Sequence, residues 1–270
     1  VKTDNHTPEE FAFMYRNGKN YLDRHEALEA LKSEKTALAK AIFAEALNDK
    51  YRGLRKTAIQ MADLSNASTL AALLKMADSD ADPDVRAAAL TALAKTGDKQ
   101  YVATMQKYLG TDQPYSVVGA AIAGFAKLDS KAALSYTKAL EGDDAEGIVQ
   151  VLAQLYGENP SRDYLPYFEQ KLGKVDYMSA FAFFDNYQKV LAGLNDAATT
   201  EAGISRLKAV SLDSKTSLFR RFGATKALAD LRKEMEGKGN TAQAEALTKI
   251  IEEIKEQEKD STLKMYYGMF

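Results

Sequence analysis

The chain has 270 residues, of which 46% are hydrophobic, and a formal net charge of −2. A sequence of this size and composition is long enough to bury a large core. The near balance of 36 Lys and Arg against 38 Asp and Glu disfavours a basic surface that would bind nucleic-acid phosphates. The absence of cysteine excludes disulfides, thiolate metal sites and cysteine nucleophiles. No apolar run approaches the roughly 18 residues of a membrane span.

The first predicted element is a short extended segment. Residues 11–15 alternate aromatic side chains with other apolar side chains, a period of two that predicts a strand, and Asn17-Gly18 follows as a turn signal. A single strand needs a partner, so residues 1–20 are interpreted as an extended lead-in from a preceding β-rich domain. The chain starts with Val1 and not with methionine, which suggests a processed or excised protein.

A repeated pattern follows this segment. Arg24, Arg55 and Arg86 stand 31 residues apart, and each is followed by Ala three positions later and by Leu or Ile four positions later. This spacing marks one face of a helix. Weaker copies of the pattern occur at Val118, Ile148 and Arg221. We therefore predict that residues 21–270 form an all-α solenoid, a right-handed superhelix of about seven or eight stacked antiparallel helix pairs.

Residues 82–98, DPDVRAAALTALAKTGD, resemble a HEAT repeat. Asp82 is expected to cap the helix N-terminus, Pro83 suits the first helical position, and Gly97 supplies the left-handed residue that ends the helix. In HEAT repeats the Asp and Arg of this motif commonly bond between successive repeats. The resemblance therefore implies that Asp82 and the three arginines form a structural ladder and do not bind a ligand.

A narrower resemblance covers residues 11–28, FAFMYRNGKNYLDRHEAL, and residues 47–55, LNDKYRGLR. Both are similar to the C-terminal HEAT-like region of bacterial aminopeptidase N-type zinc metallopeptidases. The resemblance implies a non-catalytic domain that covers the active-site cleft and restricts the access of peptides. Its partner would be the catalytic domain of the same polypeptide, with zinc bound in that absent domain. The location would be periplasmic or secreted, with the cytoplasm as the alternative.

The chain itself lacks the elements of a catalytic site. His6 and His25 are its two histidines, and Glu29 stands where an H-E-x-x-H zinc motif needs the second histidine. No G-x-S-x-G elbow, phosphate-binding loop or G-x-G-x-x-G turn occurs. We therefore assign no catalytic, cofactor-binding or metal-binding residue.

Aromatic residues concentrate in one region. Eight of the 25 aromatic residues lie between Tyr164 and Tyr187. They are interpreted either as a bulky core or as a docking surface for a catalytic domain or a peptide, because aromatic side chains are enriched at binding hot spots. The candidate docking residues are Tyr164, Tyr167, Phe183 and Tyr187.

The predicted final element is a long charged capping helix over residues 241–264, followed by an apolar terminus that we expect to pack in its own domain. An alternative to the peptidase interpretation is a stand-alone HEAT-repeat scaffold that binds a protein partner. The length of the complete gene distinguishes the two hypotheses.

Overall fold

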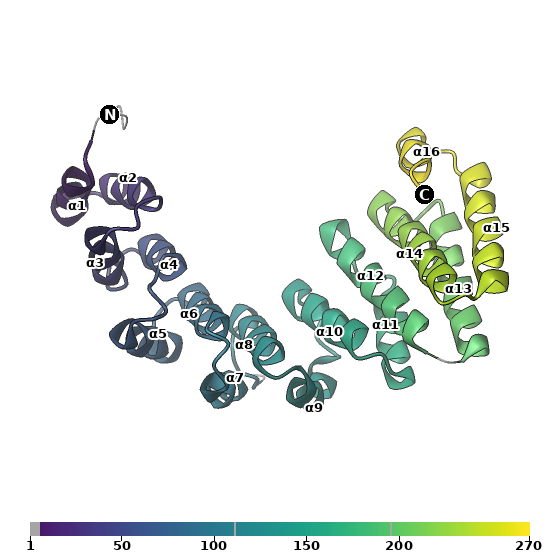
Figure 1. Ribbon diagram of the computed structural model, residues 1–270, viewed down its shortest axis with the longest axis horizontal. Helices are drawn as coiled ribbons and strands as arrows, with labels where there is room; N and C mark the ends of the chain where they lie inside the picture. The colour runs from purple at the N-terminus through teal and green to yellow at the C-terminus, as the bar shows by residue number, and fades with distance from the viewer. Residues whose placement is uncertain (1–5, 111, 195) are drawn as a thin grey trace. The chain divides into compact units, whose positions relative to one another are not determined.

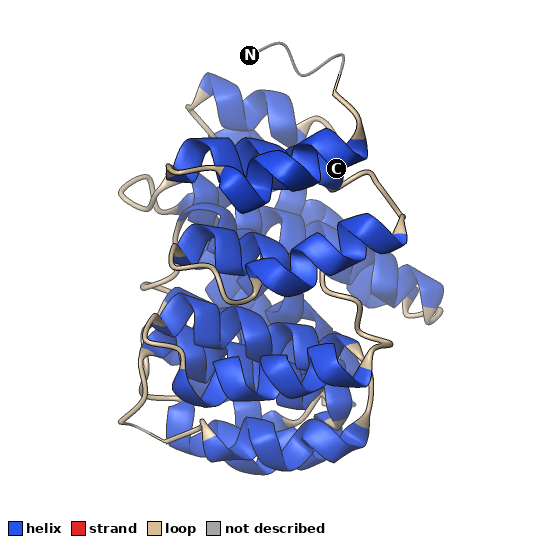
Figure 2. Cartoon of the chain, turned by 90° about the vertical axis from the view of Figure 1, so that its left-hand side faces the viewer, coloured by secondary structure: helices blue, strands red, loops and turns tan. Residues whose placement is uncertain are grey.

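The computed structural model describes residues 6–110, 112–194 and 196–270, and over these ranges the chain forms helices and loops without a strand (Figures 1 and 2). It divides into two compact units, Val1–Tyr136 and Thr137–Phe270, with the boundary inside helix α9. Among the described residues, no helix has both the length and the apolar character needed to cross a bilayer.

The helices of the first unit are α1 (Pro8–Asn17), α2 (Tyr21–Leu31), α3 (Ala37–Ala46), α4 (Arg52–Gln60), α5 (Ala67–Ser79), α6 (Pro83–Lys95), η2 (Lys99–Tyr101), α7 (Val102–Lys107), α8 (Tyr115–Leu128) and most of α9 (Ser130–Leu140). Those of the second unit are α10 (Glu146–Glu158), η3 (Arg162–Tyr164), α11 (Leu165–Lys171), α12 (Tyr177–Gly193), α13 (Ala197–Leu212), α14 (Leu218–Gly237), α15 (Thr241–Gln257) and α16 (Ser261–Tyr267).

Within each unit, even-numbered helices stack on one another and odd-numbered helices pack beside them. In the first unit α2 contacts α4, α4 contacts α6, and α6 contacts α8. In the second unit α10, α12 and α14 lie side by side, and α16 adds to α14 (Figure 1). We call these helices the even row of their unit. The predicted solenoid of stacked antiparallel helix pairs is confirmed.

Helix α6 shows how the sequence defines one repeat. The Asp82 side chain accepts the backbone N–H groups of residues 84 and 85, and Pro83 occupies the first turn. The helix ends just before Gly97, whose φ of 73° lies in the left-handed region. Between these ends, Leu90 and Leu93 are buried on the face that packs against the neighbouring helices. The predicted cap, first turn and stop signal are all confirmed.

The predicted extended lead-in is wrong, because residues 8–17 form helix α1. Thr7 and Glu10 make a reciprocal capping box, and Pro8 occupies the first turn. The buried residues of α1 include Phe11 and Tyr15, which share one helical face, whereas Phe13 is 68% exposed. The apparent period of two therefore arose because the exposed Phe13 stands in the sequence between the buried Phe11 and Tyr15. The first part of this expectation, residues 1–5, lies outside the described residues.

The predicted capping helix is divided into α15 and α16. The Glu258 carboxylate accepts the backbone N–H groups of Lys259 and Asp260, which turns the chain, and Asp260 then caps α16. The apolar terminus packs only in part. Tyr267 is fully buried, but most of the other large apolar side chains of the terminus remain exposed.

Candidate functional site

The arginines of the first two repeats donate hydrogen bonds to a carboxylate of the next repeat, whereas Arg86 donates to a backbone carbonyl of its own repeat. Arg24 holds Asp49 through two bonds, from Nε to Oδ2 at 2.9 Å and from Nη2 to Oδ1 at 3.1 Å. Arg55 holds Asp80 in the same way, at 2.8 and 2.7 Å, and also donates to the Asp49 carbonyl oxygen at 2.9 Å. Arg86 donates to the Asp80 carbonyl oxygen at 2.8 Å. All three guanidinium groups therefore donate hydrogen bonds to other groups of the protein.

Burial distinguishes this ladder from surface ion pairs. The side chains of Arg24 and Asp49 are 8% and 5% exposed. Burial by itself raises the pKa of Asp49, but hydrogen bonds from Arg24, from the Tyr51 N–H and from the Tyr15 hydroxyl outweigh it, so the pKa lies below its ordinary value. Asp49 is therefore an ionised structural group at neutral pH.

Asp82 lies beside this ladder in a different role. Besides capping α6, its Oδ2 accepts a hydrogen bond from Arg52 Nη1 at 2.8 Å, and this arginine is 63% exposed. The carboxylates that pair with the ladder arginines are Asp49 and Asp80, which the sequence analysis missed. Both lie six residues before the arginine of the next repeat, and this shared spacing is the signal that identifies them.

The candidate docking residues in the aromatic region are mostly core. Tyr167, Phe183 and Tyr187 are buried, and burial raises the pKa of Tyr187 to about 12. Tyr164 is half-buried and stacks on Tyr156, with ring centroids 3.9 Å apart. The docking interpretation is therefore wrong for Tyr167, Phe183 and Tyr187, because α11 and α12 turn these three side chains toward the interior of their unit.

A different set of apolar side chains is exposed together on the second unit, on and next to three even-row helices. We call this set the apolar strip; it comprises Tyr177, Met178, Phe181, Leu218, Phe219, Phe222, Met265, Tyr266 and Met269. Seven of its members are between 38% and 77% exposed, and Phe181 and Phe222 are half-buried. Contiguous exposed apolar surface of this kind marks interaction sites.

Ring contacts join the aromatic members of the strip. From Tyr177 to Phe219 the ring centroids are 5.5 Å apart, and from Phe219 to Phe181 they are 6.1 Å apart. The rings continue from Phe181 to Phe222 at 5.4 Å and from Phe222 to Tyr266 at 5.5 Å. The strip is therefore a continuous aromatic surface that crosses from α12 over α14 to α16.

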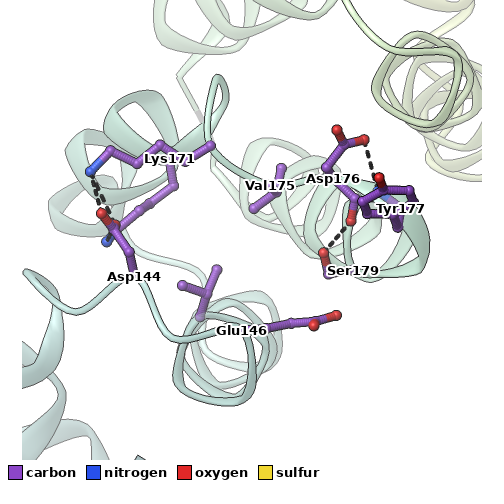
Figure 3. Close-up of a pocket in the computed structure, with 9 residues that line it drawn as sticks. Asp144, Glu146, Lys171, Val175, Asp176, Tyr177 and Ser179 are labelled. Atoms are coloured by element: carbon purple, nitrogen blue, oxygen red, sulfur yellow. Dashed lines mark hydrogen bonds and ion pairs between the residues drawn. The ribbon is translucent and has the colours of Figure 1, made fainter.

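A pocket of about 510 Å³ adjoins the strip at Tyr177 (Figure 3). On one side, Asp144 accepts hydrogen bonds from Lys171 at 2.5 Å and from Lys174 at 2.7 Å. Lys171 is 1% exposed and donates also to the Asp143 carbonyl oxygen. The bond from Lys171, followed by that from Lys174, lowers the pKa of Asp144. Two lysines thus share one carboxylate on this side of the pocket.

Glu146 and Asp176 are the other carboxylates of the pocket. Asp176 Oδ1 accepts hydrogen bonds from the Ser217 hydroxyl at 2.6 Å and from the Tyr177 N–H at 2.8 Å, and chiefly the first bond lowers the pKa of Asp176. Glu146 accepts a bond from the Gln150 amide at 3.3 Å. The positive charge of Arg220 also lowers the pKa of Asp176.

Tyr177 itself has a strained backbone. Its φ of 49° lies in the left-handed region, which side chains other than glycine rarely adopt. Strain of this kind gathers at functional sites. Tyr177 therefore combines an unusual backbone, an exposed ring and a position between the pocket and the strip.

The structure gives no metal centre to add to this surface. Over the residues that it describes, no group of three or more His, Asp or Glu side chains is arranged to hold a metal ion. Each histidine instead lies near one glutamate: His25 Nε2 is 3.6 Å from Glu29 Oε1, and His6 Nδ1 is 3.4 Å from Glu10 Oε2.

Comparisons with known proteins agree with the repeat architecture. A family model described as HEAT repeats matches residues 70–157. The solved structure of human deoxyhypusine hydroxylase in complex with glycerol has 14% identity and a TM-score of 0.41, and the match covers 91% of this chain and 96% of that one. The complex of CpcE and CpcF of phycocyanin lyase from a Nostoc species has 17% identity and a TM-score of 0.44, with 82% and 96% covered. No curated protein sequence matches the chain.

The resemblance to aminopeptidase N-type enzymes is contradicted. The matching family model describes HEAT repeats, and the similar structures are a hydroxylase and a phycocyanin lyase complex, not the C-terminal domain of a peptidase. The structure also removes the strand that seemed to require a preceding β-rich domain, since residues 8–17 are helix α1. The interpretation as the cleft-covering domain of a zinc aminopeptidase is therefore wrong.

Proposed function

We propose that the protein is a HEAT-like scaffold that binds a protein partner through the apolar strip. The observation that carries this proposal is the continuous row of exposed and half-buried aromatic rings from Tyr177 to Tyr266. Aromatic side chains dominate the energetics of binding surfaces, and methionines adapt their shape to a bound chain. Both residue types are exposed here at the ends of stacked helices, which supply a rigid support.

The structure supplies a matched pair of variants for the test. Tyr177 is the first residue of the even-row helix α12 and is 69% exposed, and Tyr115 is the first residue of the even-row helix α8 and is 67% exposed. Tyr177 belongs to the strip and Tyr115 does not. Replacing either residue by Ser removes the same ring from a similar position, so Tyr115→Ser controls for the general loss of an exposed tyrosine.

The test is a selection from a displayed library of random peptides on the immobilised chain. We expect peptides with a Kd of about 1–10 µM that lose at least about tenfold in affinity on Tyr177→Ser. The same peptides should lose less than about twofold on Tyr115→Ser. Circular dichroism checks that each variant keeps its helices. Failure to select any peptide whose binding depends on the strip would contradict the proposal.

A further inference from the structure

Sulfur occurs in this chain only in methionine. The sequence has eight Met residues and no Cys, and all eight lie among the described residues. Five of them are buried or half-buried, namely Met14, Met61, Met76, Met105 and Met235. The other three belong to the apolar strip: Met178 is 70%, Met265 64% and Met269 77% exposed. The most accessible sulfur atoms of the protein are therefore concentrated on one surface.

The three exposed methionines stand at both ends of the row of rings. Met178 follows Tyr177 in the first turn of α12, and Met265 precedes Tyr266 in α16. Met269 comes just after α16, where its backbone N–H donates to the Tyr266 carbonyl oxygen at 3.0 Å. The rings of Tyr177 and Tyr266 begin and end the series of ring contacts along the strip. A chemical change of these thioethers would therefore alter the strip at each end.

An exposed thioether reacts with a hydroperoxide. With hydrogen peroxide, one S–O bond forms as the O–O bond breaks, and the second oxygen leaves as water. The sulfur loses two electrons and the peroxide gains them. Access of the oxidant favours exposed sulfur, and the chain has no thiol that would react first. The product is a polar, chiral sulfoxide in place of a flexible apolar side chain.

We infer that Met178, Met265 and Met269 form an oxidation-sensitive site, at which hydroperoxides produce sulfoxides and thereby weaken binding to the strip. This inference rests on the proposed function and adds its regulation. A sulfoxide oxygen holds water that an apolar partner would have to displace, so the oxidised strip binds such a partner less tightly. The fold is kept, because none of the three side chains is in the core.

The change is reversible. Methionine sulfoxide reductases return the sulfur to the thioether, while a dithiol is oxidised to a disulfide and the sulfoxide oxygen leaves as water. This chain has no cysteine to supply the dithiol, so the reductant belongs to another molecule. The strip would then alternate between an apolar form that binds and a polar form that does not.

The experiment uses library-selected peptides whose binding depends on Tyr177, restricted to sequences without Met, Cys or Trp so that the peptide itself resists oxidation. The folded chain is treated with hydrogen peroxide, the excess is removed with catalase, and mass spectrometry of proteolytic fragments follows each methionine. Fluorescence anisotropy of the labelled peptides measures affinity before oxidation, after oxidation, and after reduction by sulfoxide reductases for both sulfoxide epimers with dithiothreitol.

We expect the three strip methionines to be oxidised at least about fivefold faster than the buried Met105 and Met235. When the strip methionines alone are oxidised, the affinity should fall at least about tenfold and should return to within about twofold of its starting value after reduction. Circular dichroism should show the same helical content in all three states.

Two variants identify the side chains responsible. The triple variant Met178→Leu, Met265→Leu, Met269→Leu replaces the strip thioethers by apolar groups of similar size that peroxide does not oxidise. Its affinity should change less than about twofold on treatment with peroxide. The control variant Met14→Leu, Met61→Leu removes two half-buried methionines outside the strip and should stay as sensitive as wild type. Each chain is compared with itself, so an effect of Leu on the starting affinity does not enter.

The outcomes separate the inference from the proposed function. The inference is overturned by equal oxidation of strip and buried methionines, by an affinity that oxidation of the strip leaves unchanged, or by a loss that the reductases do not reverse. A loss of wild-type size in the triple variant also overturns it. In each of these cases the Tyr177-dependent binding of the untreated chain leaves the proposed function standing. If the untreated chain selects no peptide that depends on the strip, the proposed function fails before peroxide is added, and the inference fails with it.

Discussion

Arg221 and Glu258 make within the second unit the kind of contact that Arg24 and Asp49 make within the first. Arg221 Nη2 donates to Glu258 Oε2, and the two side chains are 10% and 1% exposed. The other carboxylate oxygen of Glu258 accepts the backbone N–H groups of residues 259 and 260 at 2.8 and 2.9 Å. This single carboxylate therefore joins α14 to the turn between α15 and α16.

We expect Glu258→Ala to release α16 and to lower the free energy of unfolding by about 3 kcal/mol, because it leaves the Arg221 cation buried without its partner. Hydrogen exchange should show faster exchange of the amides of α16, and urea unfolding gives the loss of stability. The control is Glu256→Ala, which removes an exposed carboxylate from α15. Equal effects of the two variants would contradict a structural role for the buried pair.

A second prediction compares two arginines that both pair with an Asp of the next repeat. Arg24→Ala should lower the free energy of unfolding by about 3 kcal/mol, because its pair with Asp49 is buried. Arg52→Ala should cost much less, because the Arg52 side chain in the pair with Asp82 is 63% exposed. Urea unfolding of both variants under the same conditions measures the difference, and a larger effect of Arg52→Ala would refute the ranking by burial.

The repeat arginines were predicted from the sequence, whereas neither of their carboxylate partners was. Arg24, Arg55 and Arg86 stand inside an apolar helical pattern, which makes their period visible. Asp49 and Asp80 have the same period, but they lie in loops where no apolar pattern surrounds them. Their role depends on how one repeat stacks on the next, which is a property of the packed structure.

The apolar strip could not be predicted for a related reason. Tyr177, Phe219 and Tyr266 are distant in sequence and meet only because α12, α14 and α16 stack in one row. The density of aromatic residues indicated instead Tyr167 and Phe183, which are core. Local composition shows where bulky side chains gather, but tertiary packing decides which of them stay exposed.

The third prediction concerns pH. The folded protein holds the pKa of Asp49 below its ordinary value near 3.8, so the unfolded chain binds more protons in acid. The stabilisation by Asp49 is therefore complete above the unfolded pKa and is lost as the pH falls through the folded pKa. We expect the difference in urea midpoint between wild type and Asp49→Asn to shrink between about pH 5 and pH 2.

Other carboxylates do not obscure this comparison. Asp63, whose pKa is lowered to about 2 chiefly by its hydrogen bond from Lys40, titrates in the same range. Because Asp63 is present in both chains, its contribution cancels in the difference between wild type and Asp49→Asn. A difference that stays constant down to about pH 2 would show that Asp49 does not stabilise the fold through its charge.

The last prediction concerns the strained backbone of Tyr177. At an ordinary helical position Ala is more stable than Gly by about 1 kcal/mol. At Tyr177 the φ of 49° penalises every residue that has a Cβ, by about 1–2 kcal/mol, and glycine avoids this penalty. We therefore expect the usual order to reverse, so that Tyr177→Gly is more stable than Tyr177→Ala by about 0.5–1 kcal/mol. Both variants lose the ring, so the comparison isolates the backbone.

The neighbouring Met178 supplies the control for this reversal. It is 70% exposed, lies in the same turn of α12, and does not share the positive φ of Tyr177. Met178→Ala should therefore be more stable than Met178→Gly, in the usual order. Thermal unfolding of the four variants measures both differences. If Ala is more stable than Gly at both positions, Tyr177 is not strained. If the order reverses at Tyr177 alone and both Tyr177 variants bind peptides more weakly, the protein gives up stability at a residue that it uses for binding.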